Sequence, residues 1–157
     1  MSKVYIKHNP NGDTRTAPKD ITFEQFQEAN DSHRDDVSNV MERLATILYN
    51  RGCMHDWTKK TYEKLFYDNF LSTMNHGTNF VEDEWYQLHI KYEKHHPFSK
   101  CHDDIDLLDI IETIVDCVCA GKARSGEVRP LEFNQEILEK AVKNTVALVD
   151  NLTEVVE

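Results

Sequence analysis

Apolar side chains recur at steps of three and four residues between positions 22 and 49, and this periodicity is the strongest constraint on the fold. At about 100° per residue these positions form one narrow stripe on a helix. The stripe consists of Phe26, Ala29, His33, Val37, Val40, Leu44 and Ile47. Thr22 and Gln25 have the spacing of a capping box, and Gly52 is a candidate stop. The segment is therefore predicted to be a long amphipathic helix.

Four further segments show helical periodicity, and we expect helices over about 59–74, 82–95, 104–120 and 133–151. Thr58 is a candidate cap for the first of them, and Pro97 bounds the second. The connections between the helices are short. The chain is thus predicted to be all-α, a bundle of about five helices formed by residues 21–157.

Residues 1–20 are predicted to form a separate N-terminal arm. The stretch 3–7 could form a short strand, and residues 8–20 contain Pro10, Asn11-Gly12 and Pro18, which favour turns. The arm is therefore expected to be irregular or a hairpin.

Composition excludes several classes of protein. The net charge is −10, which argues against general nucleic-acid binding because phosphate contacts need clustered Lys and Arg. No run approaches the roughly 20 apolar residues of a membrane span, and the N-terminus lacks the apolar segment of a signal peptide. The four cysteines have no CxxC spacing. We therefore expect a cytoplasmic protein with reduced thiols that does not bind membranes.

Several histidines and aspartates stand at positions that suggest metal ligands, although each has a simpler interpretation. His33 lies on the apolar stripe, where it could equally be a hydrogen-bonded core histidine. His55-Asp56 could be a loop residue and a helix cap. The histidines of "HIKYEKHH" could form a solvated patch, and Asp116 belongs to an acidic stripe typical of an exposed helix face.

Taken together, these residues form a more specific pattern than any one of them. Imidazoles and carboxylates from separate helices commonly build a metal site in the core of a bundle. The candidate ligands are His33, His55, Asp56, His89, His95, His96 and Asp116. Cys53, Cys117 and Cys119 leave open a mixed Cys/His zinc site.

The order of an upstream His, a His-Asp pair and a downstream Asp on about five helices resembles the HD-domain superfamily of metal-dependent phosphohydrolases. The elements "HDWTK", "HIKYEKHHP" and "LLDIIETIVDCVCAGKARSG" are also similar to small HD-like proteins, many of them phage-encoded, over about residues 20–150. The resemblance implies that His33, the His55-Asp56 pair and Asp116 hold one metal. His89, His95 and His96 are similar to the extra ligands of two-metal members.

The resemblance also implies roles for other residues. Lys59 would contact a phosphate oxygen. Lys122 and Arg124, in the basic loop after the fourth predicted helix, are candidate phosphate contacts, although they could equally belong to a solvated helix end. Glu112 would orient water or a ligand imidazole, and His89 could act as a general acid if only one metal binds. One or two divalent transition ions are expected, among Mn, Fe, Co, Ni and Zn, since imidazole suits them better than it suits Mg.

The function expected from this resemblance is hydrolysis of a phosphoester or phosphoanhydride of a small substrate, a nucleotide in particular. Two alternatives stay open: a cyclic-nucleotide phosphodiesterase, and a non-catalytic module that binds a nucleotide or a protein while retaining the fold. A homodimer is also compatible with the sequence. A phage-encoded chain would act in the host cytoplasm.

Overall fold

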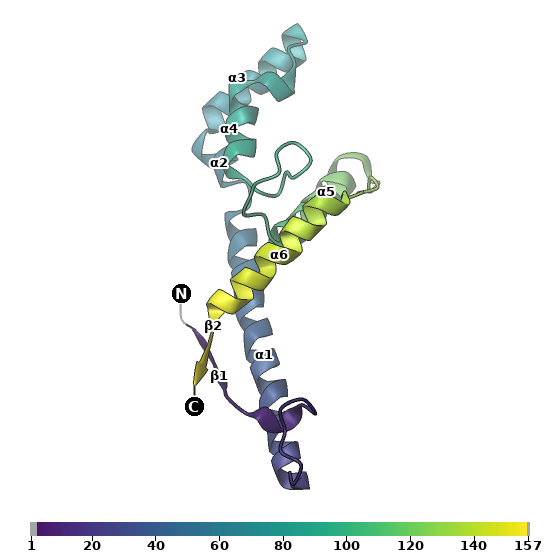
Figure 1. The fold of residues 1–157 in the computed structure, drawn as a ribbon. Coiled ribbons are helices and arrows are strands. Elements are labelled where there is room, and N and C mark those ends of the chain that lie inside the picture. The colour runs from purple at the N-terminus through teal and green to yellow at the C-terminus, as the bar shows by residue number, and fades with distance from the viewer. Residues whose placement is uncertain (1–2, 157) are drawn as a thin grey trace. The chain divides into compact units, whose positions relative to one another are not determined.

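The computed structural model describes residues 3–156, and most of them are helical (Figure 1). The prediction of an all-α fold with a short N-terminal arm is therefore confirmed. The helices are α1 (Phe23–Met54), α2 (Trp57–Thr61), α3 (Glu63–His76), α4 (Glu84–Tyr92), α5 (Leu107–Ser125) and α6 (Gln135–Leu152), with the 3-10 turns η1 (Pro10–Gly12) and η2 (Phe80–Glu82).

The chain divides into two compact units, and the first contains the residues up to Tyr49 together with those from Val146 onward. In this unit the strands β1 (Val4–Lys7) and β2 (Thr153–Val156) pair in parallel, with Val4 opposite Thr153. The ammonium of Lys3 also donates to the carbonyl of Asn151 at 2.7 Å. The strand expected near residues 3–7 is thus present, but it pairs with the C-terminal strand and does not form a hairpin within the arm.

Helix α1 begins at the predicted capping box. The backbone N–H of Thr22 donates to the side chain of Gln25 at 3.0 Å, and the N–H of Gln25 donates to the Thr22 hydroxyl at 3.3 Å. Of the predicted apolar stripe, only Ala29 is buried, and His33 is exposed. The helix also continues through Gly52, the expected stop, to Met54.

The second unit, Asn50–Thr145, has a small aliphatic core formed by Ile105, Ile110, Ile137 and Ala141. Helix α5 starts with a capping box between Asp106 and Asp109. Both carboxylates also accept hydrogen bonds from Arg51, which reaches Asp106 through two nitrogens at 2.6 and 2.7 Å. This pairing joins the last turn of α1 to the first turn of α5.

Two predicted helix boundaries differ from the structure. The segment expected as one helix over 59–74 is divided into α2 and α3 at Tyr62, which leaves helical geometry with φ −112° and ψ 33°. The helix expected over 82–95 ends at Tyr92. Periodicity does not reveal these breaks, because apolar residues on both sides of each break keep the same spacing.

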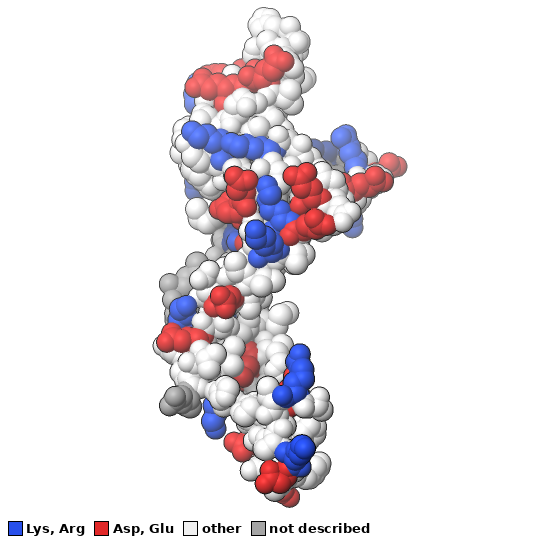
Figure 2. Space-filling view, viewed as in Figure 1, with Lys and Arg blue, Asp and Glu red and all other residues white. Residues whose placement is uncertain are grey.

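No helix in residues 3–156 is both long and apolar enough to cross a membrane. On the face drawn in Figure 2, Lys and Arg are interspersed with Asp and Glu and do not gather into one broad basic patch.

Gly121 and Gly52 provide a matched test of packing around α5. A Cβ at Gly121 would lie 2.5 Å from the carbonyl oxygen of Glu127, whereas a Cβ at Gly52 would meet nothing within 4 Å. We expect Gly121→Ala to lower the free energy of unfolding by about 1–3 kcal/mol, because backbone atoms must move. Gly52→Ala should raise it by about 0.5–1 kcal/mol through helix propensity. Urea denaturation measures both, and equal effects of the two substitutions would contradict this packing.

Candidate metal centre

The His55-Asp56 pair lies at the break between α1 and α2. Asp56 has φ 58° and ψ 27°, and it is the one non-glycine residue with positive φ in the described chain. Its side chain makes no capping hydrogen bond to α2. Asp tolerates this left-handed conformation better than most residues, but at some cost. Asp56 thus occupies the N-cap position of α2, but its carboxylate does not cap the helix and faces neighbouring side chains instead.

The three histidines of the "HIKYEKHH" segment converge because α4 ends early. On one continuous helix, His89 and His96 would be separated by about 10.5 Å along the axis. With α4 ending at Tyr92, the chain turns back, and the Nε2 atoms of these two imidazoles lie 2.7 Å apart. His95 packs between them and His55, with its ring centroid 4.4 Å from that of His55.

Thr58 and Glu93 fix the orientation and the tautomer of His89. The Thr58 hydroxyl donates to a Glu93 oxygen at 2.9 Å, so it can only accept from His89 Nδ1, which lies at 2.6 Å. His89 therefore carries its proton on Nδ1, and the lone pair of its Nε2 faces Nε2 of His96 at 2.7 Å. All three side chains are buried. Trp85 stacks on the other side of the His89 ring, at 4.8 Å between centroids.

Glu112 fixes the orientation and the tautomer of two other imidazoles. Its Oε1 lies 2.9 Å from Nδ1 of His55 and 3.2 Å from Nδ1 of His95. A carboxylate only accepts, so both histidines donate through Nδ1 and direct Nε2 elsewhere. A carboxylate or other acceptor behind the imidazole is the usual arrangement for a histidine that binds a metal.

The Nε2 atoms and the carboxylates of Asp56 and Asp116 meet in one region. Asp56 Oδ1 lies 3.5 Å from Nε2 of both His89 and His95, while Asp56 Oδ2 lies 3.4 Å from Nε2 of His55. Asp116 Oδ1 is 3.5 Å from the same His55 atom. Asp56 Oδ1 and His95 Nε2 are buried without a hydrogen-bond partner. Buried polar atoms with no partner are costly, and a cation between them would satisfy both.

These residues form two groups with the spacing of metal ligands. One group is Asp56, His89, His95 and His96, and the other is His55, His95 and Asp116. Within each group the ligand atoms lie within 4.8 Å of one another. His33 belongs to neither group; it lies in the first unit, beside a hollow lined in part by β1.

The same packing divides the histidines into two electrostatic classes. Burial and the neighbouring His96 lower the pKa of His89 to about 3, and burial together with His95 lowers the pKa of His96 to about 4. In contrast, hydrogen bonds to Asp116 and Glu112 raise the pKa of His55 to about 10. Burial opposes protonation of His95, but Asp56 and Glu112 outweigh it and raise its pKa to about 9.

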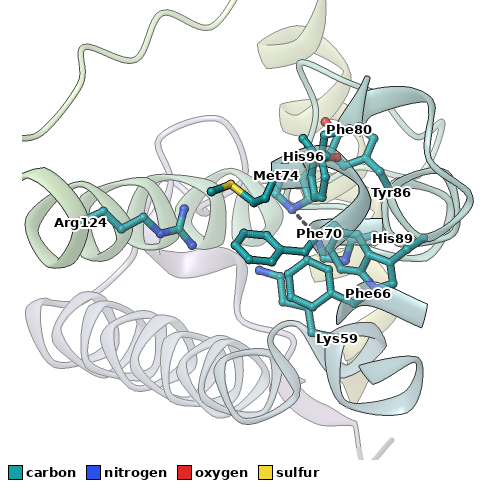
Figure 3. Close-up of a pocket in the computed structure, with 11 residues that line it drawn as sticks. Lys59, Phe66, Phe70, Met74, Phe80, Tyr86, His89, His96 and Arg124 are labelled. Atoms are coloured by element: carbon teal, nitrogen blue, oxygen red, sulfur yellow. Dashed lines mark hydrogen bonds between the residues drawn. The ribbon is translucent and has the colours of Figure 1, made fainter. Parts of the chain in front are cut away.

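A cavity of about 530 Å³ adjoins the histidines (Figure 3). His89 and His96 form part of its wall, and Lys59 and Arg124 bring positive charge to it. Arg124 extends from α5 on one side, and the aromatic side chains come from the opposite side. The remaining wall is mainly aromatic and apolar, and it includes Phe66, Phe70, Met74, Phe80, Trp85 and Tyr86. Lys122 is exposed and is not part of the lining.

Sequence reasoning did not identify Thr58, Glu93 and Arg51 as contributors to this centre. Thr58 was expected only as a cap, but Asp56 takes the N-cap position of α2, and Thr58 lies fully buried in the first turn. Glu93 belongs to a mixed-charge stretch that also suits a solvated surface, and Arg51 stands in the YNRGC segment, which carries no other charge. Only the tertiary contacts distinguish them.

The fold and these contacts define a helical protein with a candidate His/Asp metal centre. Residues 22–157 match the model of a family of unknown function (DUF5662), and the chain belongs to this family. The searches of curated proteins and of solved structures gave no match.

The role of Thr58 can be separated from general helix packing with a neighbouring threonine. We expect Thr58→Val to lower the free energy of unfolding by about 1–3 kcal/mol, since it leaves Glu93 and His89 with unpaired buried groups. Thr61→Val, at an exposed position of the same helix, should change it by less than about 0.5 kcal/mol. Thermal and urea unfolding compare the two. Equal effects would show that the Thr58 hydroxyl does not hold this network.

The two histidine classes predict a stability maximum for the metal-free protein. The raised pKa values of His55 and His95 add stability that is complete below about pH 6.5 and is lost as pH rises toward 9 to 10. The lowered values of His89 and His96 add stability that is lost as pH falls from about 6.5 toward 4 to 3. Urea unfolding in chelator at several pH values tests this. Stability that rises between pH 6.5 and 9 would contradict it.

Proposed function

We propose that the chain is a metal-dependent phosphohydrolase of the HD type that acts on nucleotides. The observation that carries this proposal is the convergence of imidazole Nε2 atoms on the Asp56 carboxylate, beside a cavity with cationic side chains. Imidazoles whose Nδ1 atoms are already held, and buried ligand atoms without partners, are costly unless a cation uses them. The donor set of imidazole and carboxylate suits Mn, Fe, Co, Ni or Zn.

The geometry supports two cation positions that share Asp56. His95 occurs in both ligand groups, but its single Nε2 lone pair can serve only one cation. The first position would use Asp56 Oδ1 with His89, His95 and His96. The second would use Asp56 Oδ2 with His55 and Asp116. Nε2 of His55 lies 3.4 Å from Asp56 Oδ2 and 3.5 Å from Asp116 Oδ1. His33 is not needed in this assignment.

The chain's own residues would bind and orient the phosphate. Lys59 forms an ion pair with Asp56 and also lines the cavity, so its ammonium can shift to a phosphate oxygen without leaving the site. Arg124 would hold a second phosphate oxygen from the α5 side. Glu112 would keep the His55 and His95 rings in place. Bound divalent ions would supply charge neutralisation and an acidified water.

The aromatic wall of the cavity supports a nucleotide as the substrate. Phe66 and Phe80 flank Trp85, with ring centroids 4.0 and 5.8 Å from the indole, and Phe70 and Tyr86 extend this surface. Such a surface stacks favourably on a flat base. The cavity volume lies within the range typical of small-molecule sites. If the base stacked on the aromatic wall, the phosphate of the nucleotide would lie near the cationic side chains and the histidines.

Metal content tests the cation sites directly. We expect about two equivalents of a transition metal in the wild-type protein and about one in Asp116→Asn. Asp56→Asn should bind well under one equivalent, because it removes the ligand common to both positions. Asp68→Asn, at an exposed carboxylate on α3, is the control and should match the wild type. Inductively coupled plasma mass spectrometry gives the numbers; less than one equivalent in the wild type, unchanged by Asp56→Asn, would overturn the sites.

Activity is tested with metal-loaded protein and a panel of nucleoside mono- and triphosphates and cyclic nucleotides. We expect released phosphate with a noncyclic nucleotide, a loss of at least 100-fold in Asp56→Asn, and a drop of about 10-fold or more in kcat/KM for Arg124→Ala. His76→Ala, at an exposed histidine on α3, should retain full activity. Tight nucleotide binding without turnover would instead support a binding module, and cleavage of only cyclic substrates would identify a phosphodiesterase.

A further inference from the structure

Helix α5 has two chemically distinct faces. One face carries Glu112 and Asp116, which contact the histidines of the candidate metal centre. The other is an apolar stripe, which we call the α5 stripe: Leu107, Ile111, Ile114, Val115 and Val118, of which Leu107 also packs partly against the aliphatic core. Ile111, Ile114 and Val115 are 40%, 41% and 55% exposed, and the rest of the second unit, Asn50–Thr145, leaves them uncovered. A soluble protein rarely leaves a continuous aliphatic stripe in water.

The spacing of the α5 stripe matches another helix. Leu107, Ile111, Ile114 and Val118 are separated by steps of four, three and four, the pattern with which two helices interlock along a seam. The neighbouring helix α6 also exposes two aliphatic residues one turn apart, Leu138 and Val142, which are 38% and 49% exposed. The two helices form an antiparallel hairpin, since Leu107 at the start of α5 bonds to Thr145 near the end of α6 (Figure 1).

We propose that the α5 stripe binds the same stripe of a second copy of this chain, so that two α5–α6 hairpins form an antiparallel four-helix interface. A self-complementary seam pairs naturally about a two-fold axis. Placing the axis between Ile114 and Val115 sets Ile111 against Val118 of the second copy.

The charges along α5 favour the antiparallel orientation. The segment before the helix is acidic: Asp103 and Asp104 are exposed, and each pairs with one lysine of the same chain, Lys140 and Lys94. The last turns of the helix instead contain Lys122 and Arg124. Antiparallel pairing brings Lys122 of each copy close to the acidic start of the other, and it also sets opposite helix dipoles side by side. A parallel pairing would place like charges together at both ends.

The size of the face suits a stable dimer. Helix α5 is about 28 Å long, and α6 lies beside it only over residues 135–145, about 16 Å, so two helices each about 10 Å wide give a projected face of about 440 Å². A specific interface removes about 800 Å² of accessible surface from each partner, and a ridged helical face has more accessible area than its projection. A second copy is therefore large enough and complementary enough to cover the hairpin.

The mass of the full-length protein in solution tests the interface. Light scattering after size exclusion should give twice the chain mass of 18.4 kDa for the wild type. Ile114→Glu should give the monomer mass, because it buries a carboxylate at the seam. Val81→Glu, at an equally exposed aliphatic position in η2, should remain dimeric. A wild-type monomer at about 100 µM, or a dimer that Ile114→Glu leaves intact, would overturn the proposal.

Single-cysteine variants test the orientation even if Ile114→Glu fails to fold. In a chain whose four cysteines are replaced by serine, Val115→Cys lies close to the two-fold axis and should form a disulfide-linked dimer on oxidation. Leu107→Cys residues would be about 22 Å apart in the antiparallel seam and should not link. Linking at residue 107 and not at 115 would overturn the antiparallel assignment. These outcomes do not depend on metal or activity, so they are independent of the proposed function.

Discussion

The contact between Arg51 and the two carboxylates that begin α5 is the interaction on which the candidate centre depends. Arg51 lies four residues before His55, and Asp106 and Asp109 lie shortly before Glu112 and Asp116. By joining the two chain segments, the guanidinium sets how far the His-Asp pair lies from the carboxylates of α5. Burial raises the pKa of Asp109, so its charge is costly without this partner. Loss of Arg51 would leave the buried carboxylates of Asp106 and Asp109 without their cationic partner, and the start of α5 would no longer be held to the end of α1.

Once Arg51 has fixed the distance between these two segments, the positions of the protons determine which histidine nitrogens can bind a cation. Three of the imidazoles that direct Nε2 toward Asp56 have an oxygen acceptor at Nδ1. The acceptor is Thr58 for His89, and it is Glu112 for His55 and His95. The resulting lone pairs point into the same region as two carboxylates. Such an arrangement is unfavourable by itself, since like partial charges face each other, and protonation of His55 and His95 compensates it in the absence of a metal. Protons and cations therefore compete for the same atoms.

The sequence predicted the fold class and most of the converging residues, because helical periodicity and residue chemistry are local properties. It placed His55, Asp56, His89, His95, His96 and Asp116 as candidate ligands, and the structure brings all of these together, while His33 lies in the other unit. The left-handed turn at Asp56, the break after Tyr92 and the burial of Thr58 depend on tertiary packing and have no periodic signature. The parallel pairing of the two terminal strands joins segments about 150 residues apart, which no local pattern predicts.

The two faces of α5 place unusual demands on one helix. Its carboxylate face must stay fixed to within tenths of an ångström to hold ligand atoms, while its aliphatic stripe favours association. A net charge of −10 per chain opposes the pairing of two copies through a long-range repulsion that salt screens. In the proposed dimer, the apolar contacts of the α5 stripe and the attraction between basic and acidic helix ends must outweigh this repulsion. A partner helix packed along the stripe would also restrict rotation of α5 about its axis. Since that rotation would move Glu112 and Asp116 relative to His55, association and ligand geometry are coupled through a single rigid element.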